Sequence, residues 1–222
     1  MIPSLLRPNS PQLIRVTFDQ WDTGLLLLIV TILNLPLAFG GSTNVFRFSS
    51  QSFQSTHFLQ LFTHPFTHVS WYHFLLDASA FFTLYPSLLE RRPTKRLAFL
   101  AATGIGSLTA ALLFHPEVAT IGFCGLSGIA HGMMAVWSLQ LIKHSMSSRP
   151  TRLLGFLSLT VVILKCAVEL VWQSPVIGFA HFHLMGTPIL PSHAGGVVGG
   201  LVAFFLSQSN EAIGKEPIGT AS

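Results

Sequence analysis

Charged side chains are scarce in this sequence. They make up 9% of its 222 residues, whereas an ordinary soluble domain carries about 25%. Hydrophobic residues account for 50%, and the mean hydropathy is +0.59. So few charges cannot cover the surface of a soluble fold of this size, and the sequence therefore predicts a protein embedded in a lipid bilayer.

Three further absences exclude familiar frameworks. The chain has two cysteines, Cys124 and Cys166, and both lie in apolar stretches, which excludes a disulfide scaffold. No HExxH motif of a helical zinc protease occurs. The serine elbow of the α/β-hydrolases needs GxSxG, but Ile129 stands in the last glycine position after Ser127. Any hydrolytic chemistry must therefore be built on membrane helices.

Six apolar stretches are long enough to cross a membrane. A spanning helix needs about 20 mostly apolar residues, because in hydrocarbon the backbone must pair its polar groups internally. Pro36 is expected to kink or end the first stretch, and the start of the chain lacks the features of a cleaved signal peptide. The stretches are roughly 24–39, 69–89, 97–114, 121–142, 153–172 and 190–206.

The basic residues predict the orientation of these spans. Arg47 lies in a loop on one side and Lys165 within the fifth span, whereas ten of the twelve Lys and Arg residues fall on the other side. The positive-inside rule then puts both termini in the cytoplasm, so the net charge of +4 reflects topology, and no nucleic acid is expected as a partner. The ten residues are Arg7, Arg15, Arg91, Arg92, Lys95, Arg96, Lys143, Arg149, Arg152 and Lys215.

Polar residues collect at one depth in this topology. Ionisable groups inside a membrane are costly and usually face the bundle interior at functional sites, although a single one is more often merely paired with a neighbouring helix. The second, fourth and sixth spans all enter from the outer side, with Ser127 about two turns into the fourth. Together these spans predict one polar site near the outer surface, formed by His68, His73, Asp77, Ser127, His131 and His193.

Small residues predict how two of these spans meet. Gly128, Gly132 and Ala135 follow helical spacing on the fourth span, and His193, Gly196 and Gly200 do so on the sixth. Such stripes let helix backbones approach closely in a membrane. The approach is expected to bring the His193 imidazole within hydrogen-bond reach of the Ser127 hydroxyl.

That pair of groups predicts nucleophilic hydrolysis. A serine hydroxyl attacks a carbonyl only when an adjacent base takes its proton, and a positioned histidine is such a base. The oxyanion then needs donors, which the backbone N–H groups around Ser127 and the His73 side chain can supply.

Three motifs resemble those of the rhomboid intramembrane serine proteases: GLSG at 125–128, THVSWYHFLLD at 67–77 and HAGGVVGG at 193–200. They occur in the family's order over roughly residues 58–206. The resemblance implies an all-α membrane protein, a six-transmembrane-helix rhomboid-like bundle with both termini cytoplasmic. It makes Ser127 the nucleophile, His193 the base and His73 an oxyanion donor, supported by Asp77, Gly125, Leu126, Gly128 and His131.

The resemblance also implies domains and partners. A catalytic domain at 24–206 follows a cytoplasmic segment at 1–23 and precedes a cytoplasmic tail at 207–222. Its first outer loop covers about 40–67, and an outer cap loop covers about 173–192. The expected partners are the bilayer and a membrane-anchored substrate with one transmembrane helix, with no cofactor and no metal. The expected location is a bacterial inner membrane, with the site open to the periplasm.

His131 refines the resemblance. Many rhomboids have a tyrosine four residues after the serine, and GLSGIAHG is instead similar to the rhombosortase branch. Members of that branch are implied to cleave secreted proteins at a C-terminal signal made of a glycine-rich motif, one transmembrane helix and a basic tail.

Two departures from the family pattern concern the site and the outer loop. Asp77 stands where the family usually has Asn; an ionised carboxylate would repel an oxyanion, whereas a protonated one can donate a hydrogen bond. Leu59 and Gln60 replace the usual Trp-Arg pair, so the loop's phenylalanines are expected to hold it at the interface.

Several alternatives remain open at this point. His131 is itself a possible base, although we favour a His131 that packs beneath His193 and orients it. Lys165 and Glu169 are expected to neutralise each other as an i,i+4 pair. A catalytically inactive rhomboid-like binder of membrane helices is a third function, after the second, a histidine-lined metal transporter or channel. The latter would use His68, His73, His131, His181, His183 and His193.

Overall fold

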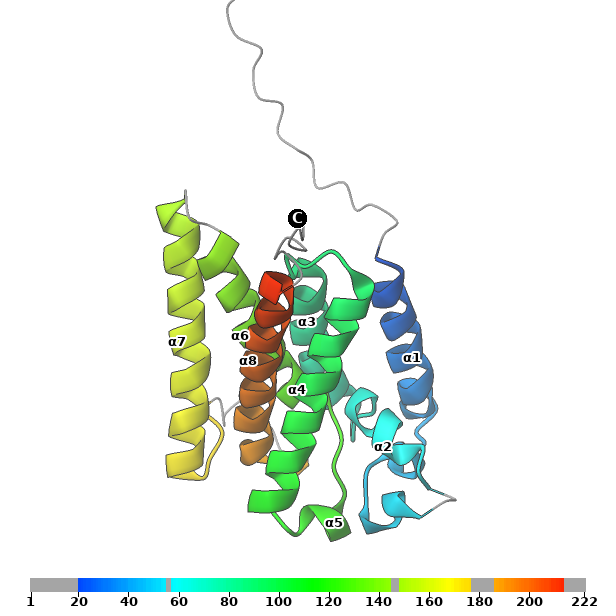
Figure 1. Cartoon of the computed structure of the whole chain (residues 1–222). Helices are drawn as coiled ribbons and strands as arrows, with labels where there is room; N and C mark the ends of the chain where they lie inside the picture. Colours follow the sequence, from blue (N-terminus) through cyan, green and yellow to red (C-terminus); the bar gives the residue numbers. More distant parts are fainter. Residues whose placement is uncertain (1–19, 55–56, 145–147, 177–185, 214–222) are drawn as a thin grey trace, which may run out of the picture.

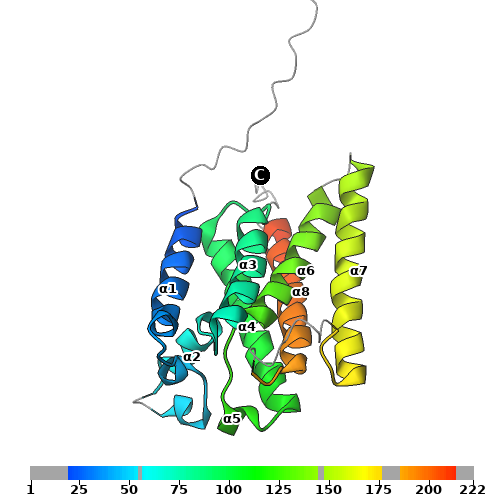
Figure 2. The same cartoon turned by 180° about the vertical axis from the view of Figure 1, so that it is seen from behind.

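The computed structural model describes residues 20–54, 57–144, 148–176 and 186–213. Within these residues, six long helices run side by side and alternate in direction along the chain (Figures 1 and 2). Their bounds lie close to the predicted stretches except at the start of the fourth and at the end of the sixth, where the helix continues to Ile213. The helices are α1 (Trp21–Ala38), α3 (Trp71–Ser87), α4 (Pro93–Phe114), α6 (Ser127–His144), α7 (Arg149–Trp172) and α8 (Leu190–Ile213).

Four of these helices are long and apolar enough to cross a membrane, counting only the described residues: α1, α4, α7 and the Leu190–Ser209 part of α8. The other two are shorter or more polar. α3 has 17 residues, and α6 carries His131, Gln140 and Lys143. Large apolar side chains such as Leu28 and Leu157 remain exposed on α1 and α7, as expected of lipid-facing helices.

Short elements gather at the end of the bundle where α3, α6 and α8 begin (Figure 1). Four lie between α1 and α3, and α5 (Val118–Ile121) lies between α4 and α6. Phe48 and Phe123 exchange two backbone hydrogen bonds of 2.9 Å, which tie the first outer loop to the segment before α6. The four elements before α3 are η1 (Asn44–Phe46), η2 (Ser50–Phe53), α2 (Gln60–Thr63) and η3 (His64–Phe66).

The start of α6 differs from the prediction. A helix was expected from residue 121, whereas α6 begins at Ser127. Gly122 and Gly125 have φ angles of +84° and +108°, a backbone region that glycine adopts without steric cost, and they break the helix before Ser127. Ser127 is therefore the first residue of α6, not two turns inside it. A residue at this position has no intrahelical partner for its N–H.

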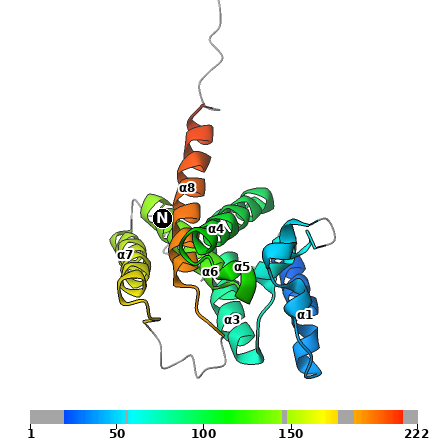
Figure 3. The same ribbon diagram turned by 90° about the horizontal axis from the view of Figure 1, so that it is seen from below.

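α8 packs between α6 and α4. Figure 3 shows α4, α6 and α8 in the middle of the bundle, with α1 and α7 on opposite sides. A Cβ atom at Gly196 would overlap the carbonyl oxygen of Gly128, and one at Gly200 would lie 2.7 Å from that of Gly132. The contact between the predicted glycine stripes of α6 and α8 is therefore present.

The other two glycines of HAGGVVGG face a helix that the sequence analysis did not consider. A Cβ at Gly195 would overlap the carbonyl oxygen of Gly106, and one at Gly199 would overlap that of Ala102. In each glycine pair of α8, one glycine contacts α6 and the other contacts α4, which explains why the glycines occur in pairs.

A buried ion pair joins α1, α3 and α4 at the opposite end of the bundle. Arg96 and Asp22 are almost fully buried, and Arg96 Nε lies 3.2 Å from Asp22 Oδ2. The Tyr85 hydroxyl donates a 2.7 Å hydrogen bond to the same oxygen, and Arg96 Nη2 donates one to Thr23 Oγ1. These contacts fix α1 against the rest of the bundle.

Replacing Asp22 with alanine is expected to lower the free energy of unfolding by about 3 to 5 kcal/mol, because the Arg96 guanidinium stays buried without its counter-charge. Denaturant titration in detergent micelles measures this loss. Arg91→Ala, which removes an exposed guanidinium from the loop between α3 and α4, is the control and should lower the free energy of unfolding by less than about 1 kcal/mol. Equal stability of the native protein and Asp22→Ala would contradict the stabilising role of the Asp22–Arg96 ion pair.

Candidate active site

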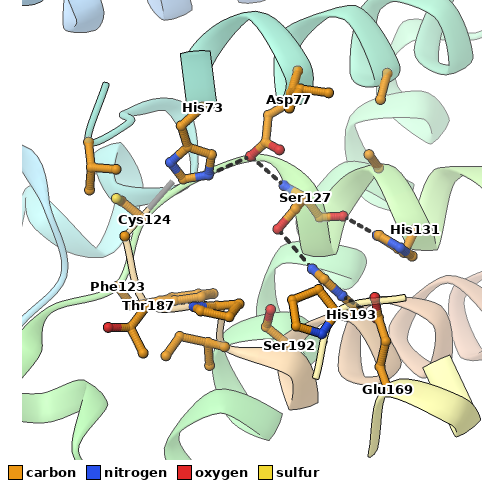
Figure 4. Close-up of a pocket in the computed structure, with 18 of the residues that line it drawn as sticks. His73, Asp77, Phe123, Cys124, Ser127, His131, Glu169, Thr187, Ser192 and His193 are labelled. Carbon is orange, nitrogen blue, oxygen red and sulfur yellow. Dashed lines mark hydrogen bonds and ion pairs between the residues drawn. The ribbon is translucent and has the colours of Figure 1, made fainter. Parts of the chain in front are cut away.

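A cavity of about 320 Å³ opens at the end of the bundle where α3, α6 and α8 begin (Figure 4). Its walls come from these three helices, from α7 and from the outer loop. The predicted polar residues on α3, α6 and α8 therefore meet at one cavity. His68, which precedes α3, does not line this cavity but contacts Asp77. The polar side chains that line it include His73, Asp77, Ser127, His131, Lys165, Glu169 and His193.

Ser127 and His193 are in contact. His193 Nε2 lies 3.2 Å from Ser127 Oγ, although 66 residues separate the two in sequence. Ser127 is the first residue of α6, and His193 lies in the first turn of α8. Gly196, about one turn after His193, packs closely on Gly128, the residue after Ser127, and this contact brings the two helix starts within reach of each other.

The other nitrogen of His193 faces a carboxylate that the sequence analysis assigned elsewhere. His193 Nδ1 lies 2.8 Å from Glu169 Oε2, and Glu169 is 1% exposed. The predicted Lys165–Glu169 pair also exists, with Lys165 Nζ 2.6 Å from Glu169 Oε1. In the sequence, the only sign of this role of Glu169 was that an acidic residue stands in an apolar helix. Its partner His193 could not be identified, because it belongs to another helix.

His131 packs against His193. The two rings are stacked with centroids 4.2 Å apart and planes at 11°. His131 Nδ1 lies 2.6 Å from the main-chain carbonyl oxygen of Ser127, whereas the Ser127 hydroxyl is hydrogen-bonded to His193. This geometry favours the alternative in which His131 supports His193 over the one in which His131 is the base.

Asp77 holds the amide of Ser127. Asp77 Oδ2 accepts a 3.0 Å hydrogen bond from Ser127 N, and His73 Nε2 lies 3.2 Å from the same oxygen. His68 Nε2 is 3.5 Å away, and its Nδ1 contacts Asn34 Oδ1 at 3.1 Å. The carboxyl group therefore caps the first N–H of α6 from a neighbouring helix, where the helix dipole favours a negative charge.

The residues around Ser127 pack tightly against this cluster. A Cβ at Gly125 would lie 2.9 Å from both Asp77 Oδ2 and His73 Nε2, so only glycine fits there. Leu126 is fully buried in the main apolar cluster, and a Cβ at Gly128 would overlap Ser107 Oγ. Gly125, Leu126 and Gly128 thus fix the position of the serine backbone.

Gln60 makes polar contacts within the outer loop. Its Oε1 accepts a 2.6 Å hydrogen bond from Ser52, and its Nε2 donates to the Val45 carbonyl oxygen. Phe53 and Phe62 are largely exposed, as side chains that insert into a membrane interface would be. The amide of Gln60 therefore makes polar anchoring contacts where the family has a Trp-Arg pair.

His64 connects this loop to Gly125. The imidazole is buried and its Nδ1 donates to the Gln60 carbonyl oxygen at 3.0 Å, while its own carbonyl accepts the Gly125 N–H at 3.1 Å. Burial lowers the pKa of His64, which lies outside the long helices, to about 4. His64 is therefore neutral at pH 7.

This burial predicts loss of stability in acid. The pKa of His64 is about 4 in the folded protein and about 6.5 when unfolded, so the unfolded state binds the proton first as the pH falls. We expect His64 to cost about 3 kcal/mol of unfolding free energy between pH 6.5 and 4. Denaturant titrations across this range, with His64→Asn as comparison, measure it. A pH dependence that is identical in both proteins would contradict the prediction.

Three side chains among the described residues could in principle hold a metal ion, since ligand atoms of His131, Glu169 and His193 lie within 4.8 Å of one another. An imidazole binds a metal in the plane of its ring. The two rings are nearly parallel and stacked, so their lone pairs do not converge on one point. Glu169 is also already paired with Lys165. The arrangement suits a hydrogen-bonded cluster better than a metal centre.

Some predicted residues lie outside the described part of the chain. Among the histidines proposed to line a metal path these are His181 and His183, and among the topology-defining basic residues they are Arg7, Arg15 and Lys215. His68 and His73, which are described, both face Asp77.

Comparison with known families gives one match. A family model described as the rhomboid domain matches residues 55–210, well over half of the chain. A comparison with curated protein sequences gave no match. The matched region contains the Ser127–His193 contact and the Asp77 cluster. The chain is thus an integral membrane protein and belongs to the rhomboid family of intramembrane proteases.

Proposed function

We propose that the protein is an intramembrane serine endopeptidase in which Ser127 is the nucleophile and His193 the general base. The observation that carries the proposal is the 3.2 Å contact between Ser127 Oγ and His193 Nε2 at the wall of a cavity. A serine hydroxyl held by an imidazole nitrogen is the arrangement that nucleophilic acyl transfer requires.

The reaction has two stages. Ser127 Oγ attacks the carbonyl carbon of a substrate peptide bond while its proton passes to His193 Nε2. The tetrahedral intermediate then expels the amine, which takes that proton, and an acyl-serine ester remains. Water enters through the cavity, loses a proton to His193 and attacks the ester carbon. The second intermediate releases the acid, and the proton returns to Ser127 Oγ.

The oxyanion of each intermediate requires hydrogen-bond donors. The Ser127 N–H and His73 Nε2 are donors of this kind, and both are now directed at Asp77 Oδ2. The oxyanion and the Asp77 carboxyl therefore compete for the same donors. In this proposal Asp77 releases them when a substrate carbonyl enters, and His73 turns from Asp77 to the oxyanion.

Replacing Asp77 with asparagine is expected to raise kcat about tenfold at neutral pH. The amide keeps an oxygen for the Ser127 N–H but removes a negative charge close to the developing oxyanion, and two like charges about 4 Å apart repel by a few kcal/mol near a protein surface. Steady-state cleavage assays measure the change. A fall in kcat at unchanged thermal stability would show that the Asp77 carboxyl itself assists catalysis.

The finer assignments belong to the same proposal. We infer six membrane spans, with α3 and α6 added to the four apolar helices, because all six run between the same two ends of the bundle (Figure 1). The catalytic domain then covers 24–206, with both termini cytoplasmic and the site opening to the periplasm of a bacterial inner membrane. GLSGIAHG and the stacked His131 support the rhombosortase branch, whose substrates carry a C-terminal glycine-rich sorting signal.

Reconstitution in liposomes with a single-span substrate tests this function. The substrate should carry a glycine-rich segment before its transmembrane helix and a basic tail after it. We expect one cleavage in or near the helix, mapped by mass spectrometry of both fragments, and none after treatment of the enzyme with a fluorophosphonate. An intact substrate, together with zinc flux across the same vesicles, would favour a transporter instead.

A further inference from the structure

We propose that Glu169 is a positioning residue that extends the Ser127–His193 pair into a hydrogen-bonded triad. The inference rests on the proposed function and adds a third residue to its machinery. The chain of contacts runs from Ser127 Oγ to His193 Nε2 at 3.2 Å and from His193 Nδ1 to Glu169 Oε2 at 2.8 Å. Figure 4 shows the three side chains in this order, with His193 in the middle.

The two carboxylate oxygens of Glu169 have separate partners. Oε1 lies 2.6 Å from Lys165 Nζ and accepts a 3.3 Å hydrogen bond from Val176 N. Oε2 is left for His193. Since α7 supplies Lys165 and Glu169 one helical turn apart, the lysine holds one oxygen and thereby orients the other toward α8. Lys165 also supplies the counter-charge that a carboxylate with 1% exposure needs.

This contact selects the tautomer of His193. A carboxylate oxygen only accepts hydrogen bonds, so the ring nitrogen beside it carries the proton. Nδ1–H therefore donates to Glu169, and Nε2 keeps its lone pair for the Ser127 proton. In the other tautomer Nε2 would carry a proton and could not act as a base. Glu169 thus holds His193 in the one neutral form that can activate the serine.

Glu169 also balances the charge that forms during the reaction. When His193 takes the serine proton it becomes an imidazolium, and the groups that face it are the ring of His131, stacked at 4.2 Å, and the Lys165–Glu169 pair. Without the carboxylate, the imidazolium would form beside the lysine cation alone. The carboxylate next to Nδ1 therefore stabilises the intermediate, in which His193 is charged, more than the resting state.

Glu169→Gln tests the inference, because it keeps the side-chain shape but removes the charge and the acceptor-only oxygen. We expect kcat to fall about 10²-fold or more with KM within twofold of native, since both carboxylate oxygens are paired within the protein and the residue acts through His193. Glu90→Gln is the matched control; it alters an exposed ion pair with Arg92 at the far end of the bundle and should leave both constants unchanged. A kcat within twofold of native in Glu169→Gln would overturn the inference.

A double-variant cycle separates positioning from a purely structural role. If Glu169 acts through His193, adding Glu169→Gln to His193→Ala should lower the residual cleavage no further. An equal additional loss in both backgrounds would assign Glu169 to folding alone and overturn the triad. Fluorophosphonate labelling of the native protein keeps the two hypotheses apart: no adduct at Ser127 refutes the proposed function, whereas an adduct formed equally fast in Glu169→Gln refutes only the triad.

Discussion

Ser127→Ala and His193→Ala are each expected to lower kcat/KM for a single-span substrate by about 10⁴-fold or more, and the double variant should be no less active than either single variant. In the proposed mechanism the hydroxyl and the imidazole act as one unit, because the proton of the attack passes across their 3.2 Å contact. Once either group is missing the other has nothing to contribute. Cleavage in proteoliposomes under single-turnover conditions gives all four rates.

Two control variants sharpen this prediction. Ser138→Ala removes a buried hydroxyl from the same helix, which bonds the Met134 carbonyl oxygen one turn away, and should keep activity within a fewfold of native. His131→Ala removes the ring stacked on His193 and should retain measurable cleavage. If His131→Ala abolishes cleavage and His193→Ala does not, the two histidines have the opposite roles.

Gly196→Ala is expected to lower kcat by about 10²-fold or more and to lower the free energy of unfolding by about 1 to 3 kcal/mol. A Cβ at this position would overlap the carbonyl oxygen of Gly128, and backbone cannot rotate away as a side chain can. α6 and α8 must therefore separate, and a misplacement of about 1 Å at reacting groups costs roughly 10²-fold in rate. Overpacking accounts for the expected stability loss.

Cleavage rates and denaturant titrations of the same preparations measure both effects. Gly24→Ala is the matched control, because a Cβ there meets nothing within 4 Å, and it should change neither quantity. Native activity in Gly196→Ala would mean that the approach of the two helices does not set the Ser127–His193 distance.

The parts of the structure that follow from local periodicity were predictable. Apolar stretches gave the ranges of the six helices to within a few residues at most ends, and the all-helical membrane class is confirmed by the structure. The glycine spacing on α6 and α8 predicted that these helices touch, because only small residues permit such an approach. The rhomboid resemblance of three short motifs is confirmed by the family match.

Features that depend on a third helix were not predictable from one sequence. The sequence predicted that Glu169 pairs with Lys165 alone, because the residue pattern of α7 contains no sign of the contact with His193. The contacts of Gly195 and Gly199 with α4 were not predicted, because the spacing on α8 alone does not identify the neighbouring helix. The cap that Asp77 places on Ser127 depends on the break in the backbone at Gly125, which an apolar sequence profile does not reveal.

The most direct test of the central claim is the mass-spectrometric location of a fluorophosphonate adduct on the native protein in a membrane. Only an activated serine reacts, so the measurement reports the nucleophile without depending on substrate choice. We predict a single adduct at Ser127 that is absent from His193→Ala. An adduct at another serine of the cavity such as Ser192, or undiminished labelling of Ser127 in His193→Ala, would contradict the account.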